Sequence, residues 1–189
     1  MADFHYEPTT VNITSYDAFK ADVNGNGWDC DGLYGAQCVD GFMLLNYNLG
    51  YPAPYAWSGT NNAKGMWTDP ISRARNKSDK YDLIYNLADV KRGDMIIVDI
   101  WDDGHNAFAD EDYYEGATYL NCLGQNQFGT TFPTGGACFN VYPISVTNFL
   151  GAFRLKAWHQ PVPPSDMEES NRLPLIMLST GLLGGLGVQ

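Results

Sequence analysis

Apolar residues recur at three- and four-residue intervals between Cys38 and Tyr47 and fall on roughly one face of a helix. Gly50, followed by a Tyr-Pro pair, ends this pattern. The spacing therefore predicts a helix that begins at or near Cys38.

Short apolar and β-branched runs dominate the second half of the chain. Residues 95–101 read Met-Ile-Ile-Val-Asp-Ile-Trp, and the Lys-Arg-Gly-Asp segment in front of them suits a turn. The same reasoning predicts further strands over 105–109, 118–123, 139–141 and 149–155, and short helices over 62–67 and 71–75. Antiparallel strands that follow a helix favour an α+β fold, with the N-terminal helical part packed on an antiparallel sheet.

Composition divides the chain into a domain and a tail. Residues 1–159 have the apolar content of one ordinary domain, in which 1–27 is polar. Residues 160–172 are rich in proline and acid, which favours an extended linker. Residues 173–189 are nearly uncharged and contain four glycines. A membrane-spanning helix needs about 20 apolar residues of better helical composition, so we expect a docking or anchor tail.

Charge excludes some partners. The 189 residues carry 22 acidic and 11 basic side chains, a formal charge of -11. Such a surface repels nucleic acid and anionic membranes, so no nucleic-acid partner is expected. Membrane contact is expected only through the tail. The N-terminus has neither a basic nor an apolar signal region, so no signal peptide is expected.

Cys38 is the first candidate for chemistry. The thiolate is the reactive form of cysteine, and a helix N-terminus together with an imidazole lowers the thiol pKa. The alternative is a small buried residue, as free cysteines often are. Carboxylates nearby, at Asp29, Asp31 and Asp40, suggest an oxygen cage for a hard cation such as Ca²⁺. The alternative for these is a set of loop and helix-capping aspartates.

Two sequence segments together resemble one enzyme family. Residues 29–40 read Asp-x-Asp-Gly-x-Tyr-Gly-x-Gln-Cys-x-Asp, which resembles the nucleophile motif of the CHAP family, the cysteine, histidine-dependent amidohydrolases and peptidases of phage lysins and autolysins. Residues 90–98, followed by Asp-Gly-His at 103–105, are similar to the family's Pro-Gly-Asp strand and its Gly-His base, with Lys91-Arg92 in place of proline. Residues 123–126 and 149–154 resemble later strands, so the likeness covers about 25–158.

The resemblance implies a papain-like α+β domain with Cys38 as nucleophile and His105 as base. The family's usual Glu or Asp is replaced by Gly124, which leaves Asn126 as the residue expected to orient the imidazole. The resemblance also implies Ca²⁺ binding, through the carboxylates of Asp29, Asp31 and Asp40 and the carbonyls of Leu33 and Gly35. The ion would brace the loop that presents Cys38.

Other polar and aromatic residues have less specific interpretations. The backbone N–H of Cys38, or the Gln37 side chain, is expected to hold the oxyanion. Cys122 and Cys138 either face one another as a disulfide or are separate buried thiols. Surface roles suit His5, His159, Asp110, Glu111, Asp112 and Glu115. Aromatic residues that line a substrate groove, or simply pack in the core, are Tyr51, Tyr55, Trp57, Trp67 and Trp101.

The function that these features predict is hydrolysis of bacterial peptidoglycan by an amidase or endopeptidase of phage origin. We expect a virion-associated lysin whose 173–189 tail docks into phage tail proteins and which acts at the cell wall. A free endolysin, held in the host cytoplasm before lysis, is the near alternative. A catalytically silent tail or plug protein with the same fold, and a membrane-active tail, are alternatives of other classes.

Overall fold

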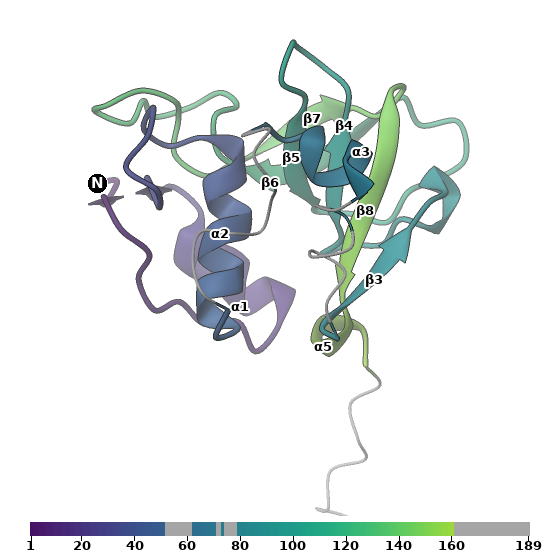
Figure 1. Cartoon of the computed structure of the whole chain (residues 1–189), viewed down its shortest axis with the longest axis horizontal. Coiled ribbons are helices and arrows are strands. Elements are labelled where there is room, and N and C mark those ends of the chain that lie inside the picture. The colour runs from purple at the N-terminus through teal and green to yellow at the C-terminus, as the bar shows by residue number, and fades with distance from the viewer. Residues whose placement is uncertain (52–61, 71–72, 74–78, 161–189) are drawn as a thin grey trace, which may run out of the picture.

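An antiparallel sheet of six strands forms the centre of the domain (Figure 1). The computed structural model describes residues 1–51, 62–70, 73 and 79–160. The strands lie in the order β3-β8-β4-β5-β6-β7. They are β3 (Tyr81–Ile84), β4 (Met95–Val98), β5 (His105–Ala109), β6 (Tyr119–Gly124), β7 (Asn140–Ser145) and β8 (Phe149–Leu155). The predicted strands are confirmed: β5 and β8 have the predicted ends, the ends of β4, β6 and β7 are shifted, and β3 was not predicted.

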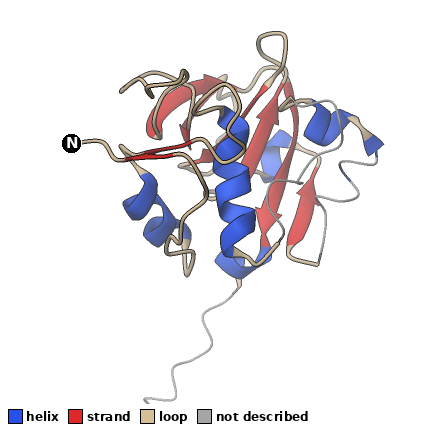
Figure 2. Ribbon diagram, turned by 60° about the vertical axis from the view of Figure 1, so that its left-hand side comes forward, coloured by secondary structure: helices blue, strands red, loops and turns tan. Residues whose placement is uncertain are grey.

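Helices α1 (Tyr16–Val23) and α2 (Cys38–Asn48) lie beside the sheet (Figures 1 and 2). Their apolar residues share one core cluster with alternate residues of β4, such as Met95 and Ile97. The intervening Ile96 and Val98 join a second cluster on the opposite face of the sheet. Both faces are therefore buried, which explains why β4 is continuously apolar.

Smaller elements complete the domain. They are the parallel pair β1 (Phe4–His5) and β2 (Gly27–Trp28), the helices α3 (Gly65–Thr68) and α5 (Lys156–His159), and the 3-10 helix η1 (Leu87–Asp89). The predicted helix over 62–67 is thus shorter, and the one over 71–75 lies almost wholly outside the described residues, as do the predicted linker and tail apart from Gln160. No helix in the described ranges has the length and apolar content that crossing a membrane requires.

Helix α1 forms in a segment that the sequence showed only as polar. Tyr16, Phe19 and Val23 are its buried residues, and Ser15 caps it by accepting a hydrogen bond from the Ala18 N–H. Three apolar positions in eight residues satisfy helical spacing but are too few to stand out in a polar stretch.

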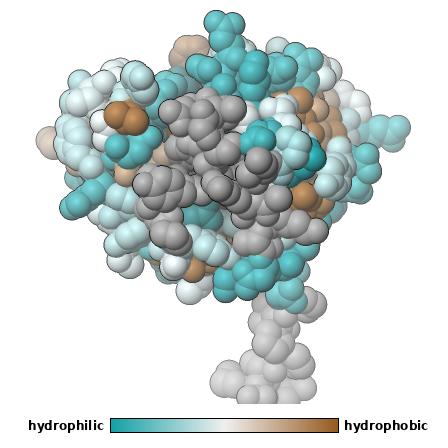
Figure 3. Space-filling model, viewed as in Figure 1, coloured by the Kyte–Doolittle hydropathy of each residue, from teal (hydrophilic) through white to brown (hydrophobic). Residues whose placement is uncertain are grey.

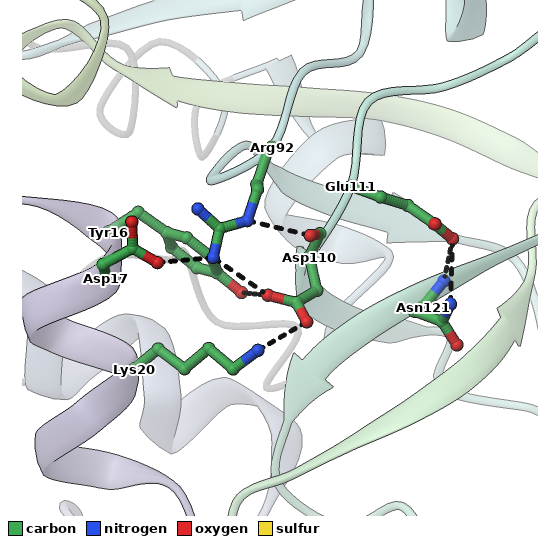
Figure 4. Close-up of polar contacts among 7 residues, drawn as sticks. All are labelled: Tyr16, Asp17, Lys20, Arg92, Asp110, Glu111 and Asn121. Atoms are coloured by element: carbon green, nitrogen blue, oxygen red, sulfur yellow. Dashed lines mark hydrogen bonds and ion pairs between the residues drawn. The ribbon is translucent and has the colours of Figure 1, made fainter.

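Asp110 links α1 to the end of β5, as Figure 4 shows. It accepts hydrogen bonds from the Tyr16 hydroxyl at 3.0 Å and from Lys20 Nζ at 2.6 Å, and its side chain is only 14% exposed. Arg92 lies on the Tyr16 ring and also pairs with Asp17. The interpretation of Asp110 as a solvated charge was therefore wrong.

Glu111 also has a hydrogen-bond partner, because its carboxylate accepts from the backbone and side-chain N–H groups of Asn121 (Figure 4).

Cys122 and Cys138 are free thiols in different apolar clusters, which confirms the second of the two alternatives for them. The surface seen in Figure 3 is mostly hydrophilic, with small separate apolar groups, as the acidic composition suggested.

Candidate active site

A buried glutamine ties the end of β6 to the acidic loop before α2. The Gln125 side chain is fully buried, and its Oε1 accepts from the Trp28 N–H at 2.6 Å. Its Nε2 donates to the carbonyls of Trp28 at 2.9 Å and Gln37 at 3.1 Å. One side chain therefore fixes both ends of the loop that leads to Cys38. This role of Gln125 was not predicted from the sequence, because a glutamine carries no signal for burial.

The N-terminus of α2 is fixed by a second set of hydrogen bonds. Asp40, which is buried, accepts from the Gln37 N–H at 2.7 Å and from the Cys30 N–H at 2.8 Å. Gln37 and Asp40 together form a capping box around the first turn. This arrangement holds Cys38 as the first residue of the helix, as the sequence predicted.

Cys38 lies in the wall of a cleft of about 530 Å³. The cleft is lined also by residues of the acidic loop, including Asp31 and Tyr34, and on its far side by Ala63 and Gly104. Gly104 directly precedes His105 in the chain. The nucleophile candidate is therefore accessible from a hollow that also reaches the start of β5.

The sulfur of Cys38 lies against the start of β5, where the backbone N–H of Asn106 bonds it. Strand β6 pairs with β5 farther along, at Phe108 and Ala109. Burial raises the pKa of the Cys38 thiol to about 11, although N–H groups of Asn106, Val39 and Cys38 itself act in the opposite direction. The expectation of a lowered thiol pKa was wrong for this structure, because removal of water outweighs the helix N-terminus.

His105 begins β5 and is almost fully buried. Its ring meets the edge of the Trp101 ring with the centroids 5.3 Å apart. Burial lowers the pKa of the imidazole to about 4, so the ring is neutral at pH 7. Among the described residues, no hydrogen bond joins His105 to Cys38 or to Asn126. The structure thus brings the sulfur next to the residue that follows His105, without a formed Cys-His hydrogen bond.

Asn126 contacts the loop that precedes Cys38. It follows β6 with a positive φ of 55°, and its Nδ2 donates to the Gln37 Oε1 at 2.9 Å. Gln37 in turn donates through Nε2 to the Tyr34 carbonyl at 2.7 Å. Both ends of the Gln37 side chain are therefore engaged in structure, which favours the Cys38 N–H over Gln37 as an oxyanion donor.

Three carboxylates converge at the expected cation site. Oxygen atoms of Asp29, Asp31 and Asp40 all lie within 4.8 Å of one another, and Oδ1 of Asp29 is buried without a partner. Burial raises the pKa of Asp40 to about 8 and raises that of Asp31 as well. A bound cation would supply the missing partner and compensate the buried charge, so the donor set fits Ca²⁺. Leu33 and Gly35 belong to the same loop.

The candidate groove aromatics fall into different environments. Trp67 is buried in the core and contributes to packing, whereas Trp101 is 65% exposed beside His105. The Tyr51 hydroxyl donates to Asp79 at 3.0 Å. Tyr55 and Trp57 lie outside the described residues. His159 is paired with buried Asp94 at 3.4 Å, and His5 stacks on Trp28.

Comparisons with known proteins point to phage lytic enzymes. Over 165 residues, 85% of this chain, the sequence is 30% identical to the D-alanyl-L-alanine endopeptidase of Streptococcus phage B30. The chain spans about a third (34%) of that relative's length. No family model matches the chain, so membership of the CHAP family stays a prediction.

A solved structure has a similar fold. The crystal structure of the wild type endolysin LysIME-EF1 superposes with a TM-score of 0.56 and 20% sequence identity, over 77% of this chain and 65% of that chain. At this identity the likeness shows the fold alone. The mixed helix and antiparallel-sheet architecture predicted from the sequence is thus also found in an endolysin.

Proposed function

We propose that this protein hydrolyses an amide bond in bacterial peptidoglycan, with Cys38 as nucleophile and His105 as base. The observation that carries the proposal is the position of Cys38, at a helix N-terminus, in a cleft, with its sulfur against the backbone N–H of the residue after His105. Similarity over 85% of the chain to a phage endopeptidase supports the substrate class.

The chemistry begins from a neutral thiol and a neutral imidazole, according to the pKa directions at Cys38 and His105. In the structure the His105 ring shares the sheet face of Val98 and Ala107, so it must first rotate toward the Cys38 sulfur. It then takes the thiol proton as the sulfur attacks the carbonyl carbon. The Cys38 N–H stabilises the resulting oxyanion. The imidazolium then protonates the leaving amine, which leaves a thioester. Water, deprotonated by His105, hydrolyses the thioester and restores the thiol.

The bond we propose is a peptide bond between D-alanine and L-alanine, by analogy with the printed activity of the phage B30 relative. Purified cell walls should lose turbidity with the wild type, and mass analysis of the released fragments should show the new termini. Cys38→Ala should abolish release. Cys122→Ala, which removes a thiol buried away from the cleft, is the matched control. Equal fragment release by wild type and Cys38→Ala would end the proposal.

We also propose that Asp29, Asp31 and Asp40 hold a Ca²⁺ ion, with the carbonyls of Leu33 and Gly35 as further ligands. When bound, the ion supplies positive charge that braces the loop before Cys38 and takes no part in bond cleavage. Titration calorimetry should detect binding to the wild type. Asp29→Asn should weaken it, while Asp79→Asn, an exposed residue outside the cluster, should not.

The proposed setting is a phage particle, with residues 173–189 docked into tail proteins and the domain acting at the cell wall. Both that segment and the linker from residue 161 lie outside the described residues. Purified particles should contain the protein by immunoblot and should lose it when 173–189 is deleted. Presence only in the lysate would favour the alternative of a free endolysin.

A catalytically silent structural protein is the second candidate. The observation that favours it is the lack of a hydrogen bond between Cys38 and His105, together with the missing side chain at Gly124. Such a protein would release no fragments in either the wild-type or the Cys38→Ala form. The same comparison therefore separates the two candidates.

A further inference from the structure

Buried polar atoms of two side chains, His105 at the start of β5 and Gln127 after β6, lack hydrogen-bond partners. Nε2 of His105 has none, and neither amide atom of Gln127 has one. An unpaired buried polar group destabilises the fold, so such groups are rare in folded proteins. An imidazole N–H and a carboxamide oxygen are complementary as donor and acceptor. Each side chain can therefore supply what the other lacks.

Gln127 folds back into the volume that Gly124 leaves empty. Gly124 ends β6, and the chain then reverses through Asn126 with its positive φ. A Cβ atom at Gly124 would collide with Gln127 Nε2 and would lie 2.9 Å from the Ala107 Cβ. The carboxamide thus takes the place of a residue-124 side chain and lies beside Ala107 of β5.

His105 shares this side of β5. Alternate residues of a strand point to the same face, which places His105 with Ala107. A cavity of about 520 Å³ has both Gln127 and Trp101 in its wall, and the Trp101 ring contacts the His105 ring. Two independent observations therefore put the Gln127 carboxamide in the neighbourhood of the imidazole.

The geometry points to Gln127 as the positioning residue for the catalytic imidazole, with its carboxamide oxygen accepting the Nε2–H of His105. This inference rests on the proposed role of His105 as base. With Nε2 carrying the proton, Nδ1 keeps its lone pair and can accept a proton. The proposed hydrogen bond requires a change of the Gln127 rotamer, because neither of its amide atoms is bonded to the ring in the structure. The glutamine thereby replaces the orienting side chain that Gly124 cannot provide.

The first test compares Gln127→Leu with Gln127→Glu in the full chain, using purified cell walls. Gln127→Leu should lower kcat about 100-fold with little change in KM, because an unoriented base loses most of its benefit. Gln127→Glu keeps an acceptor and should retain activity. Its carboxylate stabilises the imidazolium, so the acidic limb of the pH-rate profile should move to higher pH. Ser145→Ala, in the wall of the same cavity, is the control.

The second test does not depend on activity. Nitrogen NMR shifts of the His105 ring report which nitrogen carries the proton. The wild type should show the Nε2–H form, Gln127→Leu should show a mixture, and Gln127→Glu should raise the pKa of His105. An unchanged tautomer in Gln127→Leu, or a kcat within twofold of the wild type, overturns the inference. If the wild type shows no Cys38-dependent cleavage, the proposed function fails. The NMR comparison then still tests whether Gln127 forms a hydrogen bond with His105.

Discussion

Replacement of Gln125 by alanine should loosen the loop that presents Cys38. The substitution removes three hydrogen bonds and leaves the backbone N–H and carbonyl of Trp28, which is 2% exposed, without their partner. At about 1 kcal/mol for each bond, the free energy of unfolding should fall by about 3 kcal/mol. For a chain of this size, that loss corresponds to a Tm lower by roughly 6–12 °C.

Two measurements check this expectation. Thermal unfolding followed by circular dichroism gives the change in Tm, and the rate of modification of Cys38 by a thiol reagent reports the loop. Gln125→Ala should react faster at Cys38 than the wild type does. Asn121→Ala, which removes one exposed side-chain hydrogen bond to Glu111, is the matched control. A change in unfolding free energy below about 0.5 kcal/mol, the range of ordinary surface substitutions, would refute the reasoning.

Two further predictions concern buried charge. Asp94 is fully buried and accepts from Arg154 through both oxygens, at 2.9 and 2.7 Å. Asp94→Asn should therefore cost about 3 kcal/mol in urea unfolding, and a loss under 1 kcal/mol would contradict it. Because burial lowers the pKa of His105 from 6.5 to about 4, the unfolded chain takes up that proton first as pH falls. The His105 contribution to stability should be complete above pH 6.5 and should decline by about 3 kcal/mol by pH 4. Urea unfolding of His105→Gln should lack this part of the pH dependence, and identical pH curves for both proteins would rule it out.

The sequence predicted the elements that have strong local patterns. Helix α2 could be predicted because its apolar spacing and the glycine after it indicate the same helix. Strand β4 could be predicted because it is apolar on both faces. Helix α1 was missed because its few apolar residues lie in a polar segment, and β3 because it reads Tyr-Asp-Leu-Ile, with no clear alternation. These two elements depend on partners distant in sequence, which a local pattern does not contain.

The sequence predicted which residues form the candidate site better than it predicted the contacts among them. The spacing of Asp29, Asp31 and Asp40 was enough to anticipate the carboxylate cluster. The contact of Asn126 with Gln37 joins residues 89 positions apart, which a local pattern does not contain. The direction in which the Cys38 pKa shifts depends on how much water the fold removes from the thiol, and composition does not indicate this.

The burial of the Cys38 sulfur also affects how readily the thiol is oxidised. Because burial raises the pKa of the thiol, it is almost wholly protonated at pH 7. Peroxide and dissolved oxygen attack the ionised form, so the resting protein should resist oxidation to the sulfenic acid and beyond. The wild type should therefore keep its Cys38 thiol during storage in air longer than a protein with an exposed, ionised cysteine would.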